Sequence, residues 1–163
     1  FLVLCTLVPH AAALAAAVRL RVAAGVGVWQ LDGGAPAAER RRVLESFRSA
    51  RAGAVLVCTP FFREGFDVPQ IDAGMLAGGG ESSIAVLQGF GRMLTVRPGK
   101  DEVLVYDFAD GRDASAPKDY LARHWYGSRL PLYEAQGVEI ERKWGGSSSP
   151  TPSPKNLTGV SLC

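Results

Sequence analysis

Residues 54–69, AVLVCTPFFREGFDVP, hold the pattern that decides the fold of this chain. An apolar run ends at Thr59 and is followed by a loop that contains Gly65 and Asp67. Such a run is typical of a strand that is buried on both faces of a parallel sheet. A glycine lets a loop backbone approach a ligand, and a carboxylate accepts hydrogen bonds from ribose hydroxyls. The stretch therefore predicts a buried strand followed by either a nucleotide-binding loop or a simple turn.

The stretch QGFGRML at residues 88–94 favours the first of these two interpretations. Gln88 and Arg92 are four residues apart, so they share one face of the helix that we expect at 83–94. An arginine is well suited to bidentate contact with phosphate, and a glutamine amide on the same face can support it. A solvated helix arginine is the simpler alternative. Together the two stretches indicate a nucleotide site.

Strand and helix patterns alternate along the chain. Apolar strand-like runs occur at residues 1–7, 26–31, 54–58, 71–76, 102–108 and 138–143. Helix patterns occur at residues 10–21, 37–50, 83–94 and 119–136, the last with a break expected at Pro131. Alternating elements with short connections predict an α/β fold, with a parallel sheet and helices on both faces. Ligands of such folds bind at the carboxyl ends of the strands, where Asp32, Thr59 and the loop after Leu76 are expected.

The chain of 163 residues is long enough for one substantial domain, which we place at residues 1–144. From residue 145 the composition changes to Ser, Pro and Gly, which bury too little apolar surface to fold. We therefore expect a disordered tail at 145–163. The chain starts at Phe1, inside an expected strand, which is typical of a fragment of a longer protein.

Cysteine usage indicates an intracellular protein without a metal site. Cys5, Cys58 and Cys163 are odd in number, and the sequence has no CxxC pair and no histidine cluster. A reducing compartment fits this pattern: the nucleus, the cytoplasm or a viral replication site. The apolar start of the chain is interrupted by Pro9 and His10 and lacks a basic segment, so we expect no targeting signal and no membrane contact. The net charge of +2 is too small to demonstrate a polyanionic partner.

Taken in order, the motifs resemble those of the C-terminal RecA-like domain of superfamily 2 helicases. The branch that they resemble most contains restriction-enzyme motors, repair helicases and viral DNA helicases. The strand FLVLCT resembles motif IV, and LDGGAPAAERRRVLESFR resembles the element that follows it. LVCTPFFREGFDVPQIDAG resembles motif V, QGFGRML resembles motif VI, and VLVYDFAD resembles the closing strand. The resemblance covers residues 1–143 and implies a RecA-like parallel sheet in an ATP-dependent helicase, which is an ATP hydrolase.

The resemblance also implies two sets of site residues. The residues implied to contact ATP are Gly65, Asp67, Gln88, Arg92 and Arg97. Of these, Gln88 and Arg92 are implied to be catalytic, with Arg92 as an arginine finger that neutralises charge on the γ-phosphate. The residues implied to bind nucleic acid, DNA being favoured over RNA, are Cys5, Thr6, Asp32, Thr59 and Ser82.

The chain departs from the family pattern at Thr95, where the family has a second arginine. Arg97 can replace that arginine if the helix ends near Leu94; otherwise we expect weak ATP hydrolysis. One alternative function is therefore a catalytically degenerate, helicase-like module that binds nucleic acid or serves as a scaffold. Another is an unrelated doubly wound enzyme that binds a sugar nucleotide.

Half of an ATPase site is missing from the sequence. There is no GxxxxGK[ST] loop and no Asp-Glu pair that closes an apolar strand. These parts bind the ATP phosphates and Mg²⁺ in P-loop motors, so we expect them in an N-terminal RecA-like domain of the same protein. We expect the chain alone to be inactive. The basic run at residues 40–42 is either a solvated helix face or a nucleic-acid contact.

Overall fold

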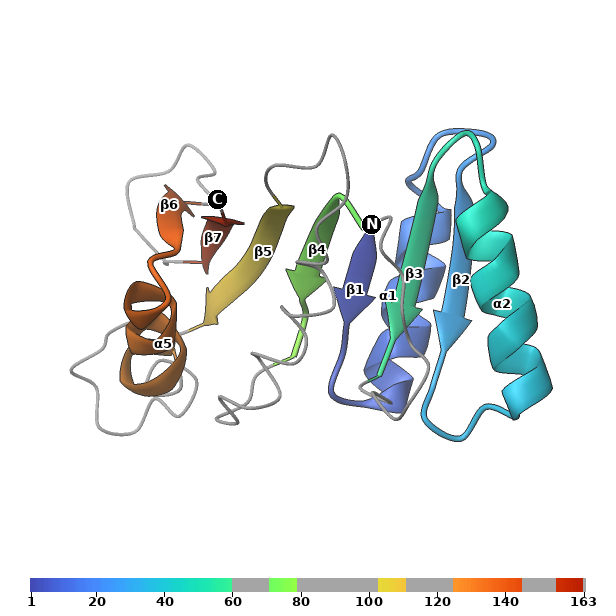
Figure 1. The fold of residues 1–163 in the computed structure, drawn as a ribbon, viewed down its shortest axis with the longest axis horizontal. Coiled ribbons are helices and arrows are strands. Elements are labelled where there is room, and N and C mark those ends of the chain that lie inside the picture. Colours follow the sequence, from blue (N-terminus) through green and yellow to red (C-terminus); the bar gives the residue numbers. More distant parts are fainter. Residues whose placement is uncertain (60–70, 79–102, 111–124, 145–154, 163) are drawn as a thin grey trace.

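The computed structural model describes residues 1–59, 71–78, 103–110, 125–144 and 155–162. Within these residues, seven strands form one sheet in the order β2-β3-β1-β4-β5-β7-β6 (Figure 1). The strands are β1 Leu2–Leu4, β2 Gly27–Leu31, β3 Ala54–Cys58, β4 Ala73–Leu76, β5 Val103–Asp110, β6 Glu139–Trp144 and β7 Lys155–Leu162. The helices are α1 Val8–Arg19, α2 Ala37–Ser49, the π-helix η1 Trp125–Arg129 and α5 Leu130–Ala135.

The first five strands of the sheet order, from β2 to β5, are all parallel to their neighbours. Helix α1 connects β1 to β2, and α2 connects β2 to β3. This arrangement confirms the expected α/β, RecA-like parallel sheet with helices on both faces. The expected helix at 83–94 lies outside the described residues.

Alternation along the buried strands separates two hydrophobic cores. On β1, Leu2 and Leu4 belong to the core that includes α2 and α5, whereas Val3 packs in a second core with α1. Neighbouring side chains of a strand point to opposite faces of the sheet, which explains why both faces of β1 are covered. The α1 core contains Ala11 and Ala15, whose small side chains are fully buried and let the helix approach the sheet closely.

Helix α2 confirms the face that its sequence predicts. Val43, Leu44 and Phe47 are its buried residues, and Phe47 meets the ring of Trp29 edge-on, with the ring centroids 6.1 Å apart. The residue before the helix is Pro36, whose fixed φ angle suits a helix start. The polar side of α2 remains toward solvent.

The end of the chain differs from the sequence expectation. We expected disorder throughout 145–163, but residues 155–162 form β7, which pairs antiparallel with both β5 and β6. Beside β5 an open sheet edge offers a row of backbone donors and acceptors, and a strand that satisfies them gains order from these hydrogen bonds. Composition alone does not reveal such a hydrogen-bonding partner. The remainder of the expected tail lies outside the described residues.

Two other boundaries also differ from the expectation. The described part of the expected helix at 119–136 consists of the π-helix η1 followed by α5. Pro131 lies in the first turn of α5, a position where a proline costs the helix no hydrogen bond. It therefore lies at the start of this helix and does not interrupt it. Strand β5 extends to Asp110, two residues past the expected end.

Candidate functional site

The carboxyl ends of four parallel strands form a common edge. Leu4 of β1 is in register with Cys58 of β3 and Leu76 of β4, and Leu31 of β2 is also in register with Cys58. The residues that come next in the chain therefore lie in one row at this edge: Cys5, Asp32, Thr59 and Ala77. Three of these residues, Cys5, Asp32 and Thr59, are candidate binding residues, and the sheet brings them together.

Thr59 connects this row to the turn after β2. Its backbone N–H donates to the carbonyl of Leu31 at 3.2 Å, and its Oγ1 accepts a hydrogen bond from the Gly33 amide, also at 3.2 Å. The side chain is nearly buried, with 6% of its surface exposed. The hydroxyl can still donate its own proton. Thr59 thus holds the turn after β2 in place.

Asp32 shapes the same turn from within. Its Oδ1 accepts from the Gly34 amide at 2.8 Å, and its carbonyl accepts from the Ala35 amide at 3.2 Å. An aspartate that binds the amide two residues ahead forms an Asx turn, which fixes the loop conformation. A role of Asp32 in binding nucleic acid remains a prediction.

Cys5 and Thr6 lie at this edge but differ in exposure. The Cys5 side chain is buried in the α1 core, and burial raises the pKa of its thiol, so the thiol stays neutral. Only the backbone of Cys5 is placed to interact at the edge, and its N–H donates to the carbonyl of Cys58 at 2.8 Å. Thr6, in contrast, is exposed. Of the two residues, Thr6 is therefore the one whose side chain can reach a ligand.

Gly78 packs directly against Thr6. A Cβ atom at Gly78 would collide with Thr6 Oγ1 and lie 2.9 Å from the Thr6 amide nitrogen. The close approach follows from the sheet, because the Ala77 amide donates to the Leu4 carbonyl at 2.8 Å. The absence of a side chain at Gly78 therefore sets the position of the Thr6 hydroxyl. The sequence predicts that the loop after Leu76 lies at this edge, but it does not reveal that contact.

The other predicted site residues lie outside the described residues: Gly65, Asp67, Ser82, Gln88, Arg92 and Arg97. Their roles remain predictions, as does the effect of Thr95. The described part of the edge corresponds to the nucleic-acid side of the predicted site.

A buried polar cluster on β5, the parallel strand farthest from β2, was not predicted. Asp107 of β5 is fully buried, and its Oδ1 accepts from Arg129 Nη1 and from the Phe108 amide, both at 2.8 Å. Its Oδ2 accepts from the Tyr133 hydroxyl at 2.6 Å, and Arg129 Nη2 donates to the Phe108 carbonyl at 3.0 Å. Burial, together with the charge of Asp107 and this hydrogen bond, raises the pKa of Tyr133, which therefore remains a proton donor. The cluster joins β5 to η1 and α5.

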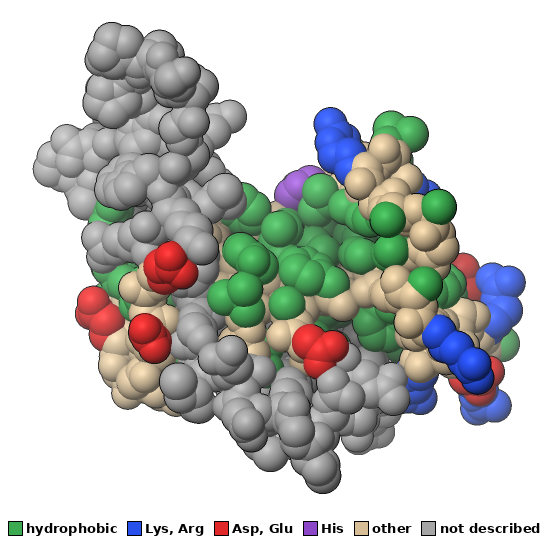
Figure 2. Space-filling view, turned by 90° about the horizontal axis from the view of Figure 1, so that it is seen from above, with side chains coloured by type: hydrophobic (Ala, Val, Ile, Leu, Met, Phe, Trp, Pro, Cys, Tyr) green, Lys and Arg blue, Asp and Glu red, His purple; other side chains and the backbone are tan. Residues whose placement is uncertain are grey.

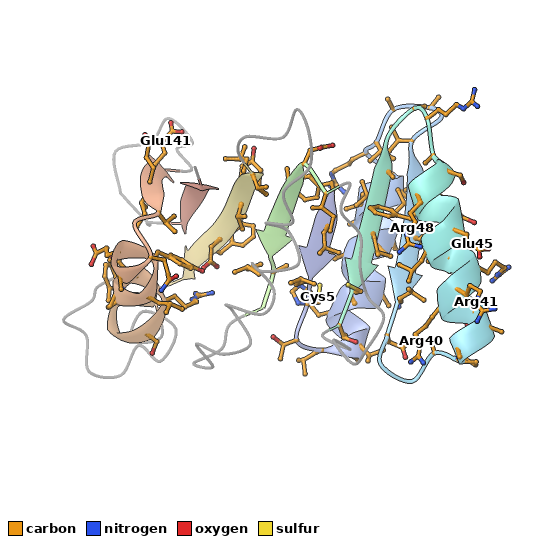
Figure 3. All side chains as sticks on the ribbon, viewed as in Figure 1. Cys5, Arg40, Arg41, Glu45, Arg48 and Glu141 are labelled. Atoms are coloured by element: carbon orange, nitrogen blue, oxygen red, sulfur yellow. The ribbon has the colours of Figure 1, made fainter. Side chains whose placement is uncertain are left out.

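The basic run on α2 begins close to the carboxyl edge. Figure 3 places Arg40 at the end of α2 near this edge, whereas Arg48 lies toward the opposite end of the helix. Arg40 is half-buried, and Arg41 and Arg42 are exposed. Both interpretations of the run, a solvated face and a nucleic-acid contact, remain open.

The five parallel strands with helices on both faces form an α/β, RecA-like domain, and polar turns lie at the carboxyl edge of its sheet. Residues 2–97 match the model of the helicase conserved C-terminal domain, and this stretch includes the segments 54–69 and 88–94. Because the match spans more than half of the sequence, the chain belongs to this family. No curated protein matches the chain.

Two further observations concern metals and membranes. In the part of the chain that the structure describes, no group of three or more His, Cys, Asp or Glu side chains could hold a metal ion. Among the same residues, no helix has the length and apolar character needed to cross a membrane.

Proposed function

We propose that the chain is the second motor domain of an ATP-dependent superfamily 2 helicase or translocase that acts on DNA. Its carboxyl edge would grip one strand and complete an ATP site together with an N-terminal RecA-like domain of the same protein. The observation that carries this proposal is the row of strand-end residues at that edge, in a chain that belongs to the helicase C-terminal domain family.

The grip follows from the neutral donors at the edge. Thr6 presents an exposed hydroxyl, and Thr59 keeps a hydroxyl proton available while it holds the turn at Gly33. Hydroxyl and backbone donors bind phosphates and carry no sequence information, as a motor that moves along any strand requires. Asp32 supports the grip from within the turn, because its carboxylate is bonded to the Gly34 amide.

The ATP side of the proposal rests on the resemblance of the motifs. Gly65 and Asp67 would approach the ribose, and Gln88 and Arg92 would face the phosphates of an ATP held by the N-terminal domain. ATP, with Mg²⁺ held by that domain, supplies the phosphoryl group whose hydrolysis drives the cycle. Arg92 would neutralise the charge that develops on this group, a contribution of about 10³–10⁵ in rate for arginine fingers.

The second candidate is a catalytically degenerate module that binds nucleic acid without hydrolysing ATP. The observation that favours it is Thr95, a neutral residue where the family has an arginine. A threonine offers one hydroxyl and no positive charge, so it cannot replace a guanidinium at a phosphate. Arg97 would have to supply that charge in an active motor.

ATP hydrolysis by the protein with both motor domains distinguishes the two candidates. The motor predicts hydrolysis that single-stranded DNA stimulates strongly and RNA stimulates less. The degenerate module predicts nucleic-acid binding with no stimulated hydrolysis. Exchange of Thr95 for arginine serves as the matched variant, because it restores hydrolysis only if the missing charge is the defect.

A further inference from the structure

Several arginines lie at the amino edge of the sheet, opposite the edge described above; Arg48, in the last turn of α2, is one, and three others lie at or beyond the helix ends. Helices α1 and α2 both run from the carboxyl edge to the amino edge, so their last turns end there (Figure 1). Arg19 is the last residue of α1, Arg21 lies in the turn after it, and Arg51 lies in the turn after α2. All three are exposed. We call Arg19, Arg21 and Arg51 the amino-edge arginines.

The two turns that carry these residues touch each other. The Gly27 amide donates to the Gly53 carbonyl at 3.1 Å, and a Cβ atom at Gly25 would lie 3.5 Å from the Ala52 Cβ. Gly25 and Gly53 have φ angles of 92° and 114°, a conformation that residues with a side chain rarely adopt. The two turns are therefore fixed in shape and lie side by side, so the amino-edge arginines lie at the same edge of the sheet.

Among the described residues, most carboxylates lie away from the amino-edge arginines. The acidic residues of the first 59 positions lie elsewhere: Asp32 at the carboxyl edge, Glu39 in the first turn of α2, and Glu45 in its middle. Asp72 precedes β4 and also lies at the amino edge, near the Phe1 ammonium group, but β1 lies between its strand and β3. Figure 2 views the molecule from the amino edge: Lys and Arg side chains lie at the end where α1 and α2 lie, with some Asp and Glu side chains among them, and further Asp and Glu side chains lie at the other end.

Hydrogen bonds to backbone carbonyls and the charge of the helix ends offset only part of this positive charge. Arg19 Nη2 donates to the Val28 carbonyl at 3.4 Å, and Arg21 Nη1 donates to the Ala17 carbonyl at 3.2 Å. A helix carboxyl end carries about half a negative charge, so two helix ends offset about one of the three positive charges. Each guanidinium has five N–H donors, and these bonds use one donor in each of two residues. About two of the three positive charges of the amino-edge arginines therefore remain, with unused N–H donors.

We propose that the amino-edge arginines form a second nucleic-acid contact, which binds the phosphates of a segment outside the carboxyl-edge grip. Guanidinium groups bind phosphate in a bidentate manner, and arginine is the only basic residue type on this surface. An acidic polypeptide is the competing partner, but the family to which the chain belongs favours nucleic acid. A segment that leaves the grip would pass from the carboxyl edge around the α1–α2 end of the sheet. The proposal goes beyond the proposed function, because that function needs only the carboxyl edge.

The test compares Arg21→Gln/Arg51→Gln with Arg41→Gln/Arg42→Gln in the protein that carries both motor domains. Both pairs remove two positive charges from exposed positions, but the second pair lies on α2 away from the amino edge. Affinity is measured against salt concentration for a single strand of about 8 nucleotides, which fills one grip, and for a strand about five times longer. The logarithm of the binding constant falls with the logarithm of the salt concentration by about 0.7 per phosphate contact on single strands.

For Arg21→Gln/Arg51→Gln we expect this slope to become shallower by about 1.4 on the long strand and to stay unchanged on the short one. The control pair should leave the difference between the strands unchanged. An unaltered slope on the long strand overturns the proposal, and an acidic polypeptide is then the favoured partner of the amino-edge arginines. An equal effect of the control pair also overturns it, because the cause is then either net charge or a contact by the basic run on α2, and not the amino edge. If Thr6→Ala leaves the affinity for the short strand unchanged, the carboxyl-edge grip fails by itself, whatever the long strand shows.

Discussion

The buried cluster of Asp107, Arg129 and Tyr133 gives the sharpest prediction for stability. Asp107 is fully buried, Arg129 is 4% exposed, and three hydrogen bonds of 2.6–2.8 Å converge on the carboxylate. Asp107→Ala removes the carboxylate and leaves the guanidinium in a site that water does not reach. Loss of one partner of a buried ion pair costs about 3–5 kcal/mol, a large part of the 5–15 kcal/mol that stabilises a typical domain.

The other members of the cluster allow this cost to be divided. Tyr133→Phe removes one hydrogen bond to a charged acceptor and should cost about 1.5–3 kcal/mol. Combined Asp107→Ala and Arg129→Met substitutions should cost less than the sum of the single changes, because no unmatched charge remains buried. Glu134→Ala is the control, since Glu134 is exposed on α5 and should change stability by less than about 0.5 kcal/mol.

Urea unfolding, followed by circular dichroism, measures each free energy. The account requires a loss of several kcal/mol for Asp107→Ala and a clear non-additive term in the double-mutant cycle. A loss below about 1 kcal/mol for Asp107→Ala, or strictly additive single changes, would refute the reasoning.

Three further predictions follow from the described residues. Gly78→Ala should lower the free energy of unfolding in urea by about 1–3 kcal/mol, because the added Cβ clashes with Thr6. Gly127→Ala is the control: a Cβ there has nothing within 4 Å, so this change should be neutral or stabilising. Equal effects of the two changes would contradict the contact between Gly78 and Thr6. Thr6→Ala should weaken DNA binding about tenfold, as measured by fluorescence anisotropy. The salt dependence should not change, because a neutral hydroxyl releases no counterions. Thr6→Ser should retain the affinity, and a serine variant that binds weakly would contradict a role of the hydroxyl in binding. Stability should fall as the pH rises above about 8.5–10. Burial raises the pKa of Cys58 and Tyr133 in the folded state, so the unfolded chain loses these protons at a lower pH than the folded chain does. The free energy of unfolding should then fall by about 1.4 kcal/mol per pH unit for each group. Tyr133→Phe should make this loss shallower, and an unchanged pH profile would argue against the shift.

The parallel sheet was predictable because its strands are apolar on both faces. The run at 54–58 coincides with β3, and the face of α2 that contains Phe47 follows from helical spacing. The strand-end row was predictable for a related reason, since parallel strands direct their carboxyl ends to one edge. Local pattern and tertiary structure agree at these positions.

Features that depend on a distant partner were not predictable. Strand β7 forms through pairing with β5 and β6, which the local composition at 155–162 does not indicate. The partners of Asp107 lie at positions 129 and 133, on a π-helix and a short helix that the sequence shows as one longer helix. The one local signal was an aspartate within the apolar run VLVYDFAD, where a buried charge requires a partner.

Thr59 lies at the strand end that the sequence predicts, but its hydrogen bond to Gly33 shows a structural role that the sequence does not reveal. The sequence analysis placed Thr59 at the strand end as a phosphate ligand. It does lie at that end, but its Oγ1 accepts a hydrogen bond from Gly33, so it also builds the turn. Only the folded arrangement shows which lone pairs of a hydroxyl are already used.

The measurement that tests the central claim most directly is ATP hydrolysis by the Arg92→Ala variant of the protein with both motor domains, measured with and without single-stranded DNA. The proposed function predicts that DNA-stimulated hydrolysis falls by about 10³ or more, as expected for a lost arginine finger, while DNA binding at the carboxyl edge is retained. Hydrolysis at the wild-type rate in Arg92→Ala would contradict the assignment of this chain as the half that completes the ATP site.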